Sequence, residues 1–142
     1  MIALDTQILV YAHREDSPFH GAALGALTGL AEGTAPWAIP WPVVHEFLAI
    51  VTHPRLYRPP STQEQAFGFI DAVAASPCLR WLGEGPAHLS TLKKLCQSGR
   101  IAGPVIHDAR IAALCLDHRV KELWSADRDF SRFKGLKVRN PL

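Results

Sequence analysis

The feature that most constrains the fold is an alternation of short apolar runs with longer amphipathic stretches, punctuated by Gly and Pro. The short runs predict strands at residues 2–4, 37–39, 78–82, 122–125 and 137–139. The longer stretches predict helices at about residues 18–30, 42–52, 62–75, 85–98 and 104–118. Strands that alternate with helices are typical of an α/β fold with a mainly parallel sheet. A chain of 142 residues is expected to form one domain, over residues 1–142.

Composition narrows the classes of protein without selecting a function. The formal net charge of +2 permits a nucleic-acid partner but is too small to argue for one. The 3 cysteines show no CxxC spacing and predict reduced thiols, as in a cytoplasmic protein. The N-terminus lacks the basic start of a signal peptide, and no apolar run reaches the roughly 20 residues of a membrane span. A cytoplasmic protein with no membrane partner is therefore expected.

The stretch MIALDTQILVYA places an acid at the end of an apolar run. Burying the carboxylate of Asp5 there costs several kcal/mol unless something compensates its charge. Two compensations are open from the sequence. The side chain caps the helix that follows, or it shares a cation with carboxylates that lie further along the chain.

Two helical stretches carry an acid in the same position. Glu46 follows Pro42 by four residues, and Asp108 follows Pro104 by four. Because Pro favours the first position of a helix, both acids are expected about one turn inside a helix N-terminus. Each shares its helix face with apolar residues: Val43, Ala49 and Ile50 for Glu46, and Ala112 and Cys115 for Asp108. Either acid alone is also explained by the helix dipole, which such a charge complements by ~0.3–1 kcal/mol.

A further pair of acids lies in LWSADRDF, where Asp127 follows the strand predicted at 122–125 and Asp129 comes two residues later. A turn that starts a short helix at 129–130 explains this segment equally well. In a parallel sheet, however, strand C-termini and the N-termini of the following helices share one edge, where ligands bind. The acids expected to converge there are Asp5, Glu46, Asp108 and Asp127. Carboxylates held together repel, and Mg²⁺ or Mn²⁺ relieves this repulsion because hard cations prefer oxygen ligands.

Two hydroxyls adjoin these acids. Thr6 and Ser125 are placed to orient a carboxylate or a water, although ordinary turn and cap roles explain them as well.

Together, MIALDTQILVYA, the helix with Glu46, IHDARIAAL and LWSADRDFSRFKGLKVRNPL resemble the PIN-domain family, in particular the VapC-type toxins of bacterial toxin–antitoxin pairs. The segment THPRLYRPPS is similar to a branch of these toxins found in mycobacteria and their relatives. The resemblance covers nearly the whole chain. It implies a PIN-like α/β/α sandwich with a central, mainly parallel sheet of about five strands. It also implies a Mg²⁺-dependent endoribonuclease that leaves 5′-phosphate and 3′-hydroxyl ends.

Carried over by position, the resemblance makes Asp5, Glu46, Asp108 and Asp127 the catalytic and metal-binding acids. It implies that Asp5 and Asp108 are the most direct ligands and that Asp129 is supporting. Gln7 departs from the Asn that many members have two positions after the first Asp. The implied partners are RNA, a small VapB-like antitoxin and a second copy of the chain in a homodimer. Because Arg fits phosphate geometry, the candidates for substrate contact are Arg14, Arg55, Arg58 and Arg110.

Other functions lack their required spacing. The stretch HEFLA is not the HExxH of a zinc enzyme, because Ala49 stands where the second His is needed. A phosphotransfer domain of the dehalogenase type needs a second Asp at the position of Gln7. The main alternative is a PIN-like scaffold that binds RNA or protein and has weak or no nuclease activity. Metal-dependent cleavage distinguishes the two.

Overall fold

A computed structural model describes residues 1–142, in which each of the first three strands is followed by two α-helices. The strands are β1 (Ile2–Leu4), β2 (Trp37–Pro40), β3 (Leu79–Leu82), β4 (Glu122–Trp124) and β5 (Val138–Arg139). The α-helices are α1 (Thr6–His13), α2 (His20–Ala31), α3 (Trp41–Val51), α4 (Gln63–Ala74), α5 (His88–Gly99) and α6 (Ile106–Asp117). There are also two 3₁₀ helices. The first, η1 (Gly103–Val105), precedes α6, and the second, η2 (Arg128–Arg132), follows β4.

The five strands form one sheet in the order β3-β2-β1-β4-β5, and every neighbouring pair is parallel. This confirms the α/β fold with a central parallel sheet. The chain builds the sheet outward from β1 through β2 to β3 and then crosses to the other side of β1 to form β4. Such a reversal of strand order opens a crevice at the C-terminal ends of β1 and β4. Ligands of open α/β folds bind in this position.

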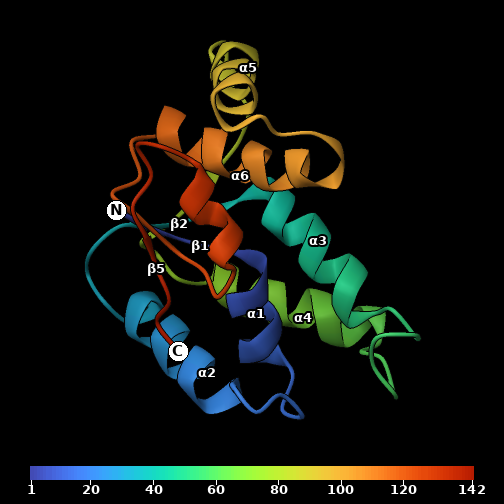
Figure 1. The fold of residues 1–142 in the computed structure, drawn as a ribbon. Coiled ribbons are helices and arrows are strands. Elements are labelled where there is room, and N and C mark those ends of the chain that lie inside the picture. Colours follow the sequence, from blue (N-terminus) through green and yellow to red (C-terminus); the bar gives the residue numbers. More distant parts are fainter.

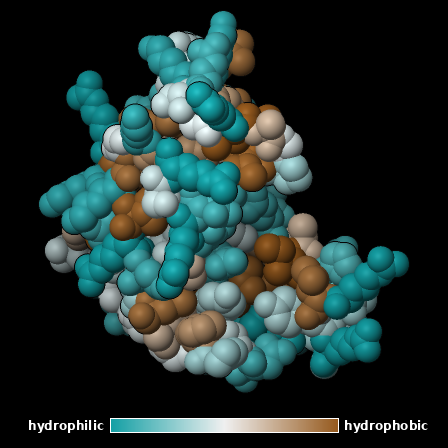
Figure 2. All heavy atoms as spheres, viewed as in Figure 1, coloured by the Kyte–Doolittle hydropathy of each residue, from teal (hydrophilic) through white to brown (hydrophobic).

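Helices cover both faces of the sheet (Figure 1). Helices α5 and α6 lie together on one side, and α1, α2 and α4 lie on the other. The core between these layers contains Trp37 of β2, Phe47 of α3 and Leu123 of β4, none of which is exposed. Hydrophilic side chains predominate in the middle of the face shown in Figure 2, and a group of hydrophobic ones lies beside α3. None of the helices is both long and apolar enough to cross a membrane.

The sequence pattern places most elements within three residues of their observed bounds, with two differences that bear on the site. Helix α1 was not among the predicted helices, because Ile8, Leu9 and Val10 form a continuous apolar run and all three are buried. The prediction that Pro104 begins a helix was wrong. Pro104 lies in η1, and α6 begins two residues later. Asp108 therefore lies in the first turn of α6.

Candidate metal centre

Asp5 follows β1 directly and is only 4% exposed. It occupies the N-cap position of α1, yet its side chain makes no capping hydrogen bond to that helix. Instead its Oδ2 accepts a hydrogen bond of 2.7 Å from the hydroxyl of Ser125, the residue that follows β4. The Ser125 oxygen in turn accepts a hydrogen bond of 2.9 Å from the backbone N–H of Asp127. These two hydrogen bonds connect the C-terminal ends of β1 and β4 around the Asp5 carboxylate.

Glu46 reaches the same region from α3. Its Oε2 accepts a hydrogen bond of 2.7 Å from the hydroxyl of Thr6, the first residue of α1. Glu46 is half-buried, whereas Val43 on the same side of α3 is fully buried and Ala49 is exposed. The expectation that Ala49 faces the core was therefore wrong, and Glu46 lies at the margin of the apolar face.

Three further carboxylates meet beside α6. Oxygens of Asp108, Asp127 and Asp129 all lie within 4.8 Å of one another. Asp127 Oδ1 accepts a hydrogen bond of 2.8 Å from the backbone N–H of Asp129 and thereby caps η2. The turn-and-helix interpretation of this segment is therefore correct. It also explains the clustering, because η2 turns Asp129 back toward the other two acids.

The protonation of these groups reflects burial and mutual repulsion. Burial is the main cause that raises the pKa of Asp5 to about 7, and the charges of Glu46 and Asp108 raise it further against the hydrogen bond from Ser125. Burial, followed by the charge of Asp127, raises the pKa of Asp108 to about 6. No Lys or Arg side chain forms an ion pair with Asp5, Glu46, Asp108 or Asp127. The protein itself thus leaves the negative charge of these carboxylates uncompensated.

This donor set fits a divalent cation with a preference for hard oxygen ligands, as Mg²⁺ and Mn²⁺ have. Every candidate ligand is a carboxylate, and no His or Cys belongs to the group of Asp108, Asp127 and Asp129. Two hydroxyls fix the orientation of individual carboxylates, which is the usual role of groups behind metal ligands.

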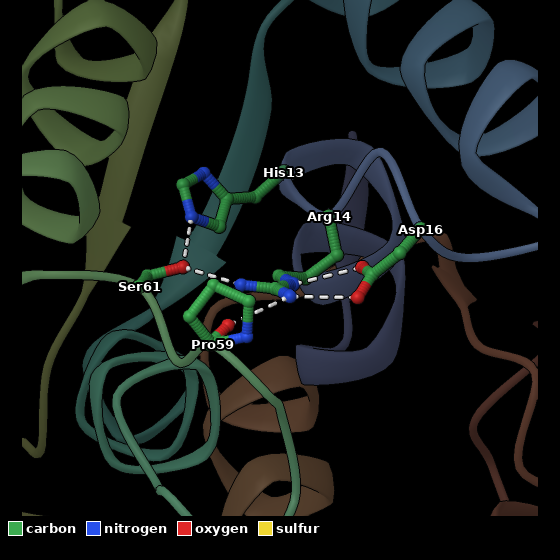
Figure 3. A network of polar contacts seen from close by, with 5 residues as sticks. All are labelled: His13, Arg14, Asp16, Pro59 and Ser61. Carbon is green, nitrogen blue, oxygen red and sulfur yellow. Dashed lines mark hydrogen bonds and ion pairs between the residues drawn. The ribbon is translucent and has the colours of Figure 1, made fainter.

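The four candidate arginines do not join this centre by any ion pair. Figure 3 shows that Arg14 is held by Asp16, the hydroxyl of Ser61 and the carbonyl of Pro59. Its guanidinium also lies over the ring of Tyr57, 4.3 Å from the ring centroid. These contacts lie at the C-terminal end of α1, about 10 Å of helix from Thr6.

The remaining three arginines lie in different settings. Arg110 pairs with Glu84 at 2.8 Å. Arg55 and Arg58 are exposed in the segment 52–62, and Arg58 lines a cavity of about 670 Å³ together with Arg14.

The contacts of Arg14 lead to a stability prediction. Replacing Arg14 by Ala removes the hydrogen bonds that hold Ser61 and Pro59 to the end of α1 and is expected to lower the free energy of unfolding by about 1–2 kcal/mol. Arg55→Ala is the matched control. Arg55 lies in the segment 52–62, which also contains Pro59 and Ser61, but it is exposed and forms no ion pair. Urea denaturation of both variants measures the difference. Equal midpoints would show that the Arg14 contacts do not stabilise the fold.

A second cavity, which the sequence pattern did not reveal, adjoins the acids. It has a volume of about 480 Å³ and is lined by Ser125, Ala126, Asp127, Arg128, Ser131, Val138 and Asn140. The available signal was the Arg between the two acids of S-A-D-R-D-F. Arg128 lines this cavity only because η2 and β5 lie side by side, and the spacing of residues in the sequence does not show that arrangement.

Comparison with known proteins agrees with this geometry. A family model described as PIN domain matches residues 2–136. Among curated proteins, the chain is 36% identical to ribonuclease VapC31 of Mycobacterium tuberculosis over 143 aligned positions, which cover 100% of both chains.

Solved structures share the fold. The crystal structure of VapBC2 from Rickettsia felis bound to a DNA fragment from their promoter matches with a TM-score of 0.71 and 23% identity, covering 99% of this chain and 98% of that one. VapC20 of Mycobacterium tuberculosis, described as a toxin that cleaves the sarcin-ricin loop, matches with a TM-score of 0.68 and 17% identity, covering 99% and 100%.

Proposed function

Because this chain belongs to the PIN-domain family, we propose that it is a metal-dependent endoribonuclease and the toxin of a VapBC-type toxin–antitoxin pair. The observation that carries this proposal is the convergence of carboxylates at the switch point of the sheet, of which Asp5, Asp108 and Asp127 have no Lys or Arg partner. The full-length similarity to a VapC ribonuclease supports RNA as the substrate.

The proposed metal-binding and catalytic residues are Asp5, Glu46, Asp108 and Asp127, with Asp129 in support. Asp5 and Asp108 are the proposed direct ligands, as the resemblance to the family implies, and the charge of Asp108 contributes to the raised pKa of Asp5. A bound Mg²⁺ supplies charge that polarises a phosphoryl oxygen and lowers the pKa of water, and Mn²⁺ is the proposed substitute.

The hydroxyls have a positioning role in this proposal. Ser125 holds Oδ2 of Asp5, which leaves the other oxygen of that carboxylate for the cation. Thr6 holds Oε2 of Glu46 in the same way. Each hydroxyl thereby fixes one carboxylate before substrate arrives, so that less reorganisation is needed during the reaction. Hydrolysis is proposed to leave 5′-phosphate and 3′-hydroxyl ends.

The proposed partners follow from the relatives. The fold is shared with the VapBC2 structure from Rickettsia felis, and this supports a small VapB-like antitoxin as the partner of this chain. We also propose that the chain forms a homodimer and acts in the cytoplasm. Arg55 and Arg58, which form no ion pair, remain proposed RNA contacts, while Arg14 and Arg110 first have to leave their carboxylate partners.

Metal removal tests the proposed function. The purified protein is expected to cleave labelled transfer, ribosomal or messenger RNA with Mg²⁺ or Mn²⁺ and to lose this activity in EDTA. Restoring excess Mg²⁺ to the same sample is the control and should recover cleavage. Folded, metal-supplied protein that cleaves none of these RNAs would instead favour a scaffold that binds RNA or protein.

A further inference from the structure

The cavity between η2 and β5 lies directly against the acidic centre, since Asp127 and Ser125 belong to both. It is open to solvent on the side of Arg128, Ser131 and Asn140, all of which are exposed. Ala126 and Val138 give it a partly apolar lining. Its volume of about 480 Å³ is within the roughly 300–1,000 Å³ typical of small-molecule sites.

Three polar side chains of this cavity, those of Arg128, Ser131 and Asn140, keep free hydrogen-bond donors, whereas Arg14 and Arg110 are paired with carboxylates. Arg128 forms neither an ion pair nor a side-chain hydrogen bond, although it stands between two aspartates in the sequence. The Ser131 hydroxyl has no hydrogen-bond partner, and Asn140 uses only its carbonyl oxygen, which accepts from the Leu142 N–H. A guanidinium, a hydroxyl and an amide NH₂ are therefore available as donors around one hollow.

A nucleic-acid strand creates a need for such donors. A cation bound by the acids neutralises the phosphate that is cut, but the next phosphate along the strand still meets the excess negative charge of the centre. Arg128 follows Asp127 in the chain and lines the cavity beside it, so it brings a positive charge next to the acidic centre. Guanidinium groups bind phosphate oxygens through two parallel hydrogen bonds.

From these contacts we infer that the cavity is a subsite for the nucleotide next to the cleaved phosphodiester. Arg128 binds the phosphate of that nucleotide, and Ser131 and Asn140 donate hydrogen bonds to its sugar or base. Val138 and Ala126 supply apolar contact for the base. This inference rests on the proposed function and assigns the recognition of one nucleotide to a cavity that adjoins the metal centre and shares Asp127 with it.

The test uses the full chain with Asp5→Asn as a background that binds RNA without cutting it. In EDTA, with a fluorescent single-stranded RNA, Arg128→Ala is expected to raise Kd about tenfold, as for the loss of one charged hydrogen bond. Lys134→Ala is the matched control, because it removes one positive charge from an exposed residue that does not line the cavity. It is expected to change Kd by less than about twofold.

Cleavage in the presence of Mg²⁺ provides a second readout with the Asp5 side chain intact. Arg128→Ala is expected to raise KM with little change in kcat, and Asn140→Ala is expected to relax the preference for one base beside the cut. If Arg128→Ala and Lys134→Ala behave alike while the unmodified protein cleaves RNA, the subsite is refuted and the proposed function stands. If the unmodified protein neither binds nor cleaves RNA, both proposals fail.

Discussion

Replacing Asp5 by Asn is expected to lower metal-dependent RNA cleavage at least about a thousandfold, which corresponds to the loss of several kcal/mol of charge stabilisation by the cation. Asp5 is the most buried carboxylate of the centre and interacts with Glu46 and Asp108. The amide keeps an oxygen to accept the Ser125 hydrogen bond but carries no charge. Its NH₂ group also points a donor, rather than an acceptor, at the cation site.

The same substitution is expected to stabilise the metal-free protein at about pH 8. The pKa of Asp5, raised from 3.8 to about 7, means that folding favours its protonated form over its ionised form by an energy on the order of 4 kcal/mol. Asn removes that ionised form, and a rise in Tm of several degrees in EDTA is expected. A variant that is more stable but inactive cannot owe its inactivity to unfolding.

Asp71→Asn is the matched control for both measurements. Asp71 is an exposed acid of α4 and lies outside the cluster, so cleavage and Tm should stay close to those of the unmodified protein. Retention of more than about a tenth of the activity by folded Asp5→Asn protein would show that this carboxylate is not a required ligand.

The second large effect is a dependence of stability on both pH and metal. In the metal-free protein, the pKa values of Asp5 and Asp108 are raised to about 7 and about 6, whereas the unfolded chain titrates near 3.8. Between these values the folded state holds protons that the unfolded state has lost. Their contribution to stability is therefore complete below about pH 4 and is lost as the pH rises through 6 and 7.

Added Mg²⁺ is expected to reverse this trend, because a cation binds the deprotonated carboxylates of the folded protein. The increase in Tm on adding Mg²⁺ should be small near pH 5 and largest above pH 7. Thermal unfolding across this range, with EDTA in one series and Mg²⁺ in the other, measures the effect. A metal-induced shift that is the same at every pH would indicate binding elsewhere on the surface.

The positions of the strands could be predicted from the sequence because they coincide with short apolar runs between Gly and Pro, and residues of β1, β2 and β4 are mostly buried. The first helix could not, because its buried residues form one apolar run with no polar face to reveal a helical period. The convergence of acids followed from the general rule that places strand ends and helix starts on one edge. What the rule did not give was the tight group of Asp108, Asp127 and Asp129, which depends on the turn of η2.

Arginine roles were harder to predict because they depend on partners distant in sequence. Arg14 is committed to Ser61 and Pro59, and Arg110 to Glu84, in each case through the folding together of separate helices and loops. Arg128 gave no signal beyond its place between two acids, since its freedom is visible only once its neighbours are known.

The hydrogen bond between Ser125 and Asp5 joins residues 120 positions apart in the chain, and β1 pairs directly with β4. During synthesis on a ribosome, β1 is made first, yet one of its two neighbouring strands and two of the acids, Asp127 and Asp129, come from the final fifth of the sequence. Contacts of such long sequence separation form late in folding. A growing chain therefore has no assembled centre until almost all of it has been translated, so that the ribosome synthesising this protein is not exposed to a finished centre on the unfinished chain.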